Sequence, residues 1–222
     1  MRPTTLVPFF AFLAACTPTG SGVPTSAQDP GDPVEVTDPV EEPGVTEADL
    51  VAAELAFLRE EEKLARDVYL TLHDTWGLQI HANIAGSEQQ HMDAVLGLLQ
   101  ARGLPDPVAD DTVGVFVDPV LDQLYDDLVG LGQVSEVDAL QVGATIEDLD
   151  LFDITELLDT PRDADVTSVL ESLHCGSRNH IRAFTDQLAS RGTSYTAAYL
   201  EPEAIDAIVA EPRESCGQGG SH

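Results

Sequence analysis

The stretch LVAAELAFLREEEKLARDVYLTL, residues 50–72, decides the fold of this 222-residue chain. Its apolar side chains recur three and four residues apart, which is the period of an α-helix with one buried face. They are Leu50, Ala53, Phe57, Leu58, Leu64, Ala65, Val68, Tyr69 and Leu72. Thr46 and Asp49 form a variant of a capping box, and Gly77 is a helix stop signal. The pattern therefore predicts a long amphipathic helix between Thr46 and Gly77.

The helical period continues along the rest of the chain, and no stretch alternates with the period of two that marks a half-buried strand. Further helices are predicted over 79–102, 120–131, from Ser135 to the break at Thr160-Pro161, over 163–191, and from Glu201-Pro202 to about 210. The segment 104–119 is rich in Pro, Asp and Gly, so we expect a longer connection there. Four long helices, two tight connections and one crossover predict an all-α, ferritin-like four-helix bundle with short accessory helices.

The N-terminal segment has the features of an export signal. Met1-Arg2 is followed by an apolar run, 6–15, that is shorter than the roughly 20 residues a bilayer-spanning helix needs. The run ends in LAAC, residues 13–16, which resembles the lipobox of bacterial lipoproteins. That resemblance implies removal of residues 1–15 and a lipid on Cys16. We therefore expect attachment to a membrane of the cell envelope, and Thr17 favours the outer membrane or its periplasmic face.

The residues after Cys16 have a different composition from the rest. The segment 16–45 is rich in Pro, Thr and acidic residues, so it cannot bury enough apolar surface to fold. We expect a disordered tether there, the bundle over 46–210, and a disordered tail over 211–222. The oligomeric state stays open, with a homodimer as one candidate.

The chain is strongly acidic. Ten Lys and Arg against 40 Asp and Glu give a net charge of −30. Because contacts with phosphate need cations, we exclude nucleic acid as a partner. Solubility, a salty habitat or the attraction of cations such as metal ions could each explain the acidity, and the charge alone does not choose among them. No CxxC pair is present, which argues against a zinc site with cysteine ligands or a rubredoxin-type iron site. Whether Cys175 and Cys216 form a disulfide is left open.

Helical bundles build metal sites from inward-facing Glu residues and Glu-x-x-His pairs. Glu88 and His91 have this spacing, which places both on one helix face, and their neighbours at helical spacing are apolar. An unpaired charge is costly to bury, so a carboxylate on an apolar face indicates a ligand. Glu147 also lies on an apolar face, and Asp150, one turn further on, is a secondary candidate.

The first and fourth helices each offer competing candidates. Periodicity does not separate Glu61 from Glu62, whereas we expect Glu60 and Lys63 to face solvent. In the fourth helix Glu171 and His174 have the Glu-x-x-His spacing but a polar face. His180 has apolar neighbours and is therefore our fourth-helix ligand.

Four stretches of this sequence resemble the ferritin-like family catalogued as domain of unknown function 2202. They are 59–69, 86–91, 142–154 and 176–184, and the similarity extends over roughly 48–200. The block GSRNHIRAF, residues 176–184, is the most specific. The resemblance implies a ferritin-like bundle able to hold a dinuclear metal centre, without implying an established activity.

The chain also shows a more distant similarity to rubrerythrin. There, a metal-binding Glu in the first helix is followed by Ala-Arg and then Tyr, which matches Glu62, 65–66 and Tyr69 and favours Glu62 over Glu61. Tyr69 is then a candidate neighbour of the metal site. Two departures stand out: Ser177 occupies the place of the Glu that precedes the fourth-helix His, and the electron-donating rubredoxin module is absent.

The predicted site comprises Glu62, Glu88, His91, Glu147 and His180. Carboxylates and imidazoles suit iron, or manganese and other divalent metals. The first hypothesis is a di-iron oxidoreductase, ferroxidase-like or peroxidase-like, that reacts with dioxygen or peroxide. The second is a non-catalytic protein that stores or senses a divalent metal. The third is a structural bundle without metal.

Overall fold

A computed structural model describes residues 46–216, and this part of the chain contains six helices and no strand. The helices are α1 (Glu47–Trp76), α2 (Gln79–Ala101), α3 (Pro119–Gly132), α4 (Glu136–Leu158), α5 (Ala164–Ser190) and α6 (Pro202–Ala210). The prediction of an all-α helical bundle is confirmed, and each predicted helix is present with ends shifted by one or two residues. The predicted signal peptide, the lipidated Cys16 and the tether over 16–45 lie outside the described residues.

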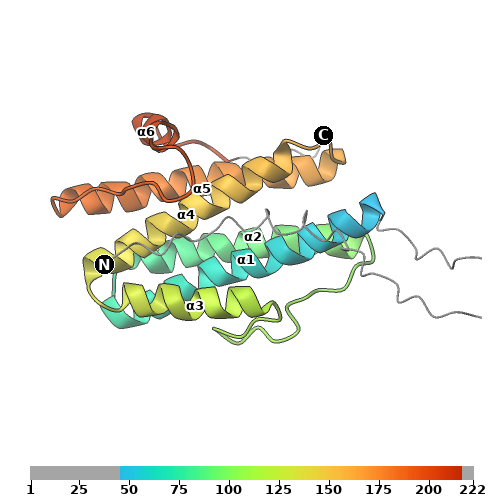
Figure 1. Cartoon of the computed structure of the whole chain (residues 1–222), viewed down its shortest axis with the longest axis horizontal. Coiled ribbons are helices and arrows are strands. Elements are labelled where there is room, and N and C mark those ends of the chain that lie inside the picture. The colour runs from blue at the N-terminus through green and yellow to red at the C-terminus, as the bar shows by residue number, and fades with distance from the viewer. Residues whose placement is uncertain (1–45, 217–222) are drawn as a thin grey trace, which may run out of the picture. The chain divides into compact units, whose positions relative to one another are not determined.

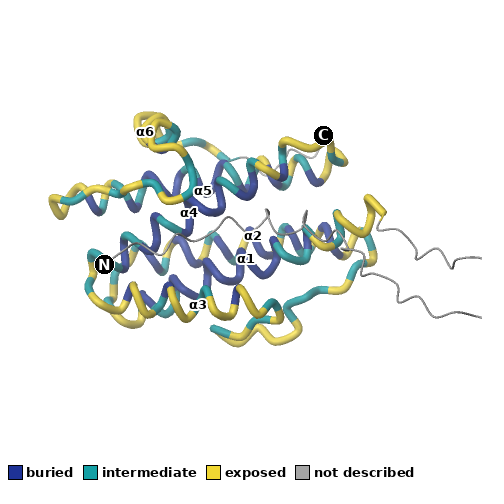
Figure 2. The backbone as a smooth tube through the Cα atoms, viewed as in Figure 1, coloured by how far each residue is buried: buried dark blue, intermediate teal, exposed yellow. Residues whose placement is uncertain are grey.

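The four long helices form two pairs (Figure 1). A turn at Gly77, whose φ of 67° suits glycine, joins α1 to α2, and α4 packs against α5. The connection between the pairs carries α3, which packs against α4, while α6 packs on α5. The buried positions run along the facing sides of the long helices (Figure 2). No helix in the described part of the chain is long and apolar enough to cross a bilayer.

Close packing in the core fixes how the two pairs meet. Tyr69 of α1 is fully buried and packs against Phe184 of α5, with ring centroids 5.4 Å apart. Gly143 of α4 faces the same ring, since a Cβ there would lie 2.3 Å from Phe184 Cε1. Only glycine allows this close approach, which brings α4 and α5 together one turn before Glu147.

The expectation that Glu60 and Lys63 face solvent is wrong, because the connection over 102–118 folds back along α1 and buries both. Glu60 accepts hydrogen bonds from the backbone N–H groups of Val117 (2.6 Å) and Asp118 (3.1 Å). Lys63 pairs with Asp67 and donates to the Thr112 carbonyl at 2.9 Å.

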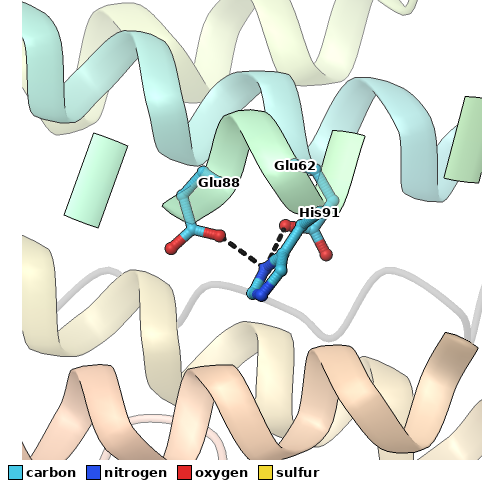
Figure 3. Close-up of side chains that lie close together, drawn as sticks. All are labelled: Glu62, Glu88 and His91. Carbon is cyan, nitrogen blue, oxygen red and sulfur yellow. Dashed lines mark hydrogen bonds and ion pairs between the residues drawn. The ribbon is translucent and has the colours of Figure 1, made fainter. Parts of the chain in front are cut away.

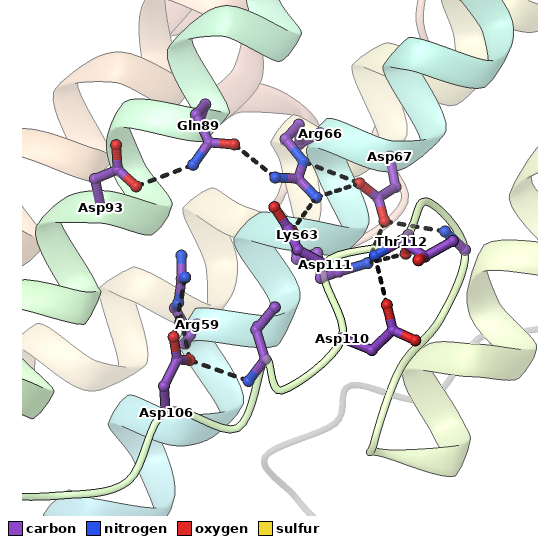
Figure 4. Close-up of polar contacts among 12 residues, drawn as sticks. Arg59, Lys63, Arg66, Asp67, Gln89, Asp93, Asp106, Asp110, Asp111 and Thr112 are labelled. Atoms are coloured by element: carbon purple, nitrogen blue, oxygen red, sulfur yellow. Dashed lines mark hydrogen bonds and ion pairs between the residues drawn. The ribbon is translucent and has the colours of Figure 1, made fainter.

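The neighbouring arginines of α1 hold the same connection (Figure 4). Arg59 donates twice to the Asp106 carboxylate, and Arg66 donates to Asp111 at 2.6 Å. Arg66 also donates to Gln89 of α2 at 2.5 Å. Arg59, Glu60, Lys63 and Arg66 thus pair with the connection rather than with water, and every residue of α1 from Leu58 to Tyr69 is buried.

The tail is ordered further than the sequence predicts. Residues 211–216 come after α6 in the sequence and lie against α5. Glu214 pairs there with Arg178 and Arg182, and Cys216 is joined to Cys175 by a disulfide. The predicted disorder over this part of the tail is therefore wrong, because local composition does not reveal these contacts with α5. The remainder, 217–222, lies outside the described residues.

Asp148 of α4 anchors the segment between α5 and α6. Its buried carboxylate accepts hydrogen bonds from the Tyr195 hydroxyl (2.7 Å) and from the backbone N–H groups of Ala198 (2.6 Å), Tyr199 (3.0 Å) and Leu200 (3.0 Å). One carboxylate thus fixes a segment that has no regular structure of its own.

We expect Asp148→Ala to lower the free energy of unfolding by about 3 kcal/mol, because it leaves several partly buried donors without their charged acceptor. Urea denaturation followed by circular dichroism measures this change. Glu156→Ala removes an exposed acid of the same helix and is the matched control, expected within about 0.5 kcal/mol of the unchanged protein. Equal effects of the two substitutions would contradict the anchoring role.

Candidate metal centre

Five acidic and histidine side chains from four helices meet inside the bundle. They are Glu62 of α1, Glu88 and His91 of α2, Glu147 of α4 and His180 of α5, and none is more than 8% exposed. They form two groups, Glu62–Glu88–His91 and Glu88–Glu147–His180, in each of which the potential ligand atoms lie within 4.8 Å of one another. The structure therefore brings together all five residues of the predicted site, with Glu88 common to both groups.

The first group joins the two helices of the N-terminal pair. His91 Nδ1 lies 2.7 Å from Glu88 Oε2 and 3.2 Å from Glu62 Oε2. Figure 3 shows the imidazole joined to both carboxylates. Glu88 and His91 are three residues apart, so both project from the same face of α2. Glu62 reaches them from α1, which distinguishes it from its neighbour Glu61.

The second group repeats this arrangement with the C-terminal pair. His180 Nδ1 lies 2.8 Å from Glu88 Oε1 and 3.3 Å from Glu147 Oε2. The Tyr69 hydroxyl donates to Glu147 Oε1 at 2.6 Å, as expected for a residue beside the site. His180 Nε2 lies 3.0 Å from the Ser87 hydroxyl, a contact that the sequence did not reveal.

Glu88 is the central residue of the arrangement. Its carboxylate is fully buried and lies between the two imidazoles, yet neither of its oxygens has a hydrogen-bond partner of acceptable geometry. His91 Nδ1 and His180 Nδ1 are close enough to Glu88 for ion pairs, but their hydrogen-bond geometry is directed to Glu62 and Glu147 instead. A buried carboxylate without hydrogen bonds is costly, and a cation between the oxygens and the nitrogens would satisfy all of them. The donor set therefore fits divalent metal ions.

The charges of the site depend on one another. Burial alone would lower the pKa of His180, but Glu88 and Glu147 outweigh it and raise the pKa to about 10. Burial likewise opposes the charge on His91, and Glu88 and Glu62 raise its pKa well above the usual value. Without metal, both imidazoles are thus protonated at neutral pH and stand in for cations.

The carboxylates divide according to their partners. Burial raises the pKa of Glu62 to about 7, although His91 opposes the shift, and burial also raises the pKa of Glu147. For Glu88, burial acts in the same direction, but the two imidazoles outweigh it and hold its pKa below the usual range. Glu88 therefore stays ionised between the histidines.

The secondary candidates fall into two classes. Glu61 and Asp150 are buried beside the site, and burial together with the nearby charge of Asp153 raises the pKa of Glu61 well above its usual value. Burial raises the pKa of Asp153 to about 6. Glu171 is exposed, and His174 lies 2.5 Å from the Arg178 guanidinium and 3.3 Å from the Thr155 hydroxyl, away from both groups.

Two small residues of α5 shape the site. Gly176 packs against His91, since a Cβ there would lie 2.5 Å from His91 Nε2. Ser177 is fully buried and donates to the Leu173 carbonyl at 3.3 Å, so this position supplies no carboxylate. The second group therefore has one ligand from α5, whereas the first has two from α2.

Comparison with known proteins shows close relatives without an assigned role. A sequence profile of the uncharacterized protein domain DUF2202 matches residues 52–212. The uncharacterized protein MJ0754 of Methanocaldococcus jannaschii is 52% identical over 157 residues, which cover 71% of this chain and 85% of that protein. The crystal structure of hypothetical protein MJ0754 from Methanococcus jannaschii aligns with a TM-score of 0.73 and 48% identity, over 78% of this chain and 98% of that chain.

We expect Gly176→Ala to weaken binding of divalent metal by about tenfold or more, because the added methyl group displaces His91. Titration of the purified protein with a divalent metal measures the affinity. Gly86→Ala is the matched control, since a Cβ at this position of α2 meets nothing within 4 Å. Unchanged affinity in Gly176→Ala would show that the position of His91 does not matter for binding.

The metal-free protein should lose stability as the pH rises. The pKa of His180 is about 10 in the folded chain against an ordinary 6.5, and that of Glu62 is about 7 against 4.5. A raised folded-state pKa means that the folded chain holds the proton longer, so the stabilisation is complete at low pH and is lost as the pH rises through the folded value. Each such proton changes the stability by about 1.4 kcal/mol per pH unit.

Urea denaturation in the presence of a chelator tests this between pH 6.5 and 9, where the free energy of unfolding should fall. His180→Gln removes one of the groups responsible and should flatten the slope. A constant or rising stability over this range in the unchanged protein would mean that the histidines are not protonated in the folded state.

Proposed function

The chain belongs to the DUF2202 family, as its motifs predicted, and we propose that it is a ferritin-like protein that holds two irons and reacts with dioxygen or peroxide. The convergence of five buried ligand side chains around the unbonded Glu88 carboxylate carries this proposal. Helical bundles with inward carboxylates and Glu-x-x-His pairs are typical holders of di-iron and di-manganese centres. Iron is the proposed metal because carboxylate and imidazole ligands suit it.

Each residue has a defined part in the proposed site. Glu62 and His91 would hold one metal, Glu147 and His180 the other, and Glu88 would contribute an oxygen to each. Tyr69 orients Glu147 by donating a hydrogen bond to the oxygen that faces away from His180. When bound, the two irons would supply the electrons that reduce dioxygen or peroxide.

The protonated imidazoles of the metal-free site fit this role. Metal ions that enter would replace the two imidazole protons, so Glu88 has a positive charge on either side in both states. Metal uptake would therefore release protons, and the affinity would fall as the pH is lowered.

Ser177 favours a second candidate, which is binding of a divalent metal without turnover. With serine at this position α5 contributes only His180, whereas α2 contributes both Glu88 and His91, so the two groups share one carboxylate and hold five ligands in all. Such a protein would store or sense the metal. Oxygen uptake by the iron-loaded protein distinguishes the two candidates, since storage or sensing without turnover predicts none.

We also propose that the bundle is anchored to a membrane of the cell envelope by lipid on Cys16. The lipobox-like LAAC and the composition of residues 16–45 support this address. Mass spectrometry of the membrane fraction tests it, because a lipidated protein begins at Cys16 with acyl chains attached. A protein that starts at Met1 and carries no lipid would refute the anchor.

The shared position of Glu88 makes the metal content of variants predictable. We expect about two irons per chain in the purified full-length protein, and about one after Glu62→Ala or Glu147→Ala, because each removes a ligand of only one group. Glu88→Ala should lose both irons, since both groups depend on it. Metal analysis after anaerobic loading and desalting measures the content.

Glu171→Ala is the control, since this exposed acid of α5 lies outside both groups and its loss should leave the iron content unchanged. Far-ultraviolet circular dichroism identifies any variant that has lost its fold. Retention of both irons in a folded Glu88→Ala protein would exclude the proposed site.

A further inference from the structure

The two cysteines within residues 46–216 lie beside the proposed metal centre. Cys175 directly precedes Gly176, the residue that packs against His91, and it forms a disulfide with Cys216 at the end of the described chain. The disulfide is thus tied to the same turn of α5 that fixes a metal-binding histidine. It is the only disulfide among the residues that the structure describes.

A cavity of about 320 Å³ connects the two features. His91, His180 and Cys216 all line it. Gln90 and Arg213 also line it and are exposed, so the cavity reaches the surface of the molecule. Its size admits a small oxidant such as hydrogen peroxide to a place where it meets both the histidines and the sulfur.

The surroundings of Cys216 suit a thiolate. The Asn179 side-chain N–H donates to Cys216 Sγ at 3.1 Å, and a donor of this kind stabilises the charged form of a thiol. Asn179 is itself buried and is fixed by contacts with the backbone of Glu214, to which it donates at 3.0 Å and from which it accepts at 2.9 Å. The polar contact to the sulfur is therefore built into the fold.

The segment that carries Cys216 has anchors other than the disulfide. Glu214 accepts hydrogen bonds from Arg178 at 2.8 and 2.5 Å, and from Arg182 at 2.8 Å. Because these contacts do not involve sulfur, they hold Cys216 at the cavity when the disulfide is reduced. A bond that served only to pin the tail would duplicate them.

We propose that Cys175 and Cys216 are a redox-active pair that supplies two electrons for the reduction of peroxide in this cavity, an inference that rests on the proposed function. The two thiols lose two electrons and two protons and form the S–S bond. Hydrogen peroxide accepts both, its O–O bond breaks, and two waters form. The pair thus supplies the electrons that a rubredoxin module would otherwise deliver.

The cycle closes by thiol–disulfide exchange with an external dithiol. Its thiolate attacks one sulfur of the pair, and the external dithiol leaves oxidised while Cys175 and Cys216 regain two thiols. Cys216 is half-buried and lines the open cavity, so an external thiol can reach it, whereas Cys175 is almost fully buried.

The first test needs no metal. The full-length, chelator-treated protein is incubated with millimolar dithiothreitol at neutral pH, and the reduced cysteines are identified by alkylation and peptide mass. The pair should be reduced while the helical circular dichroism is unchanged. Reduction that occurs only when the helices unfold would identify a structural bond and overturn the proposal.

The second test follows the electrons. The reduced full-length protein is loaded anaerobically with iron and given three equivalents of hydrogen peroxide, more than two ferrous ions can reduce. We expect consumption of about two peroxides per chain with a newly formed Cys175–Cys216 disulfide, against about one in the Cys175→Ser/Cys216→Ser variant. Metal analysis of that variant verifies that it still binds iron.

The outcomes distinguish a failure of the cysteine pair from a failure of the proposed function. If the iron-loaded protein consumes peroxide while Cys175 and Cys216 stay reduced, the cysteine pair is not the donor and the proposed function stands. If the protein neither binds iron nor consumes peroxide faster than Glu88→Ala, the proposed function fails and this inference fails with it. Disulfide formation at the same rate in Glu88→Ala and in the unchanged protein would also overturn the role of the pair at the metal centre.

Discussion

The carboxylate of Glu88, buried between His91 and His180, is the constraint around which the bundle is organised. A buried negative charge in this position must be compensated, either by protonated side chains of the surrounding helices or by a bound cation. The two histidines do so from different helix pairs, and Glu62 and Glu147 complete the groups on either side. The same geometry thus explains how the pairs are held together and why a divalent metal fits between them.

The rest of the fold keeps this centre in place. Gly143 and Gly176 allow close approach of Phe184 and His91, respectively, and Tyr69 connects the aromatic core to Glu147. The connection over 102–118 holds Arg59, Lys63 and Arg66 of α1, the helix from which Glu62 reaches the first group. Some of the many acidic residues therefore pair with buried cations. Asp106 pairs with Arg59, and Asp67 pairs with Lys63.

Much of this could be predicted from the sequence, because helical periodicity reports directly which residues share a buried face. Glu147 and His180 were identified by their apolar neighbours, and Glu88 and His91 by their spacing as well. Periodicity could not separate Glu61 from Glu62, since both have apolar neighbours, and only the similarity to rubrerythrin favoured Glu62 as the ligand. Periodicity also fails where a distant part of the chain buries a residue.

Long-range contacts account for the remaining differences. Glu60 and Lys63 are buried by a connection more than 40 residues away in sequence, and the tail over 211–216 is held by arginines of α5. Neither contact leaves a local signal in the sequence.

Anomalous X-ray diffraction at the iron edge, measured from iron-loaded crystals, tests most directly whether one metal lies on each side of Glu88. The account predicts two peaks, one among Glu62, Glu88 and His91 and one among Glu88, Glu147 and His180. Peaks only at surface carboxylates, with none beside Glu88, would contradict it.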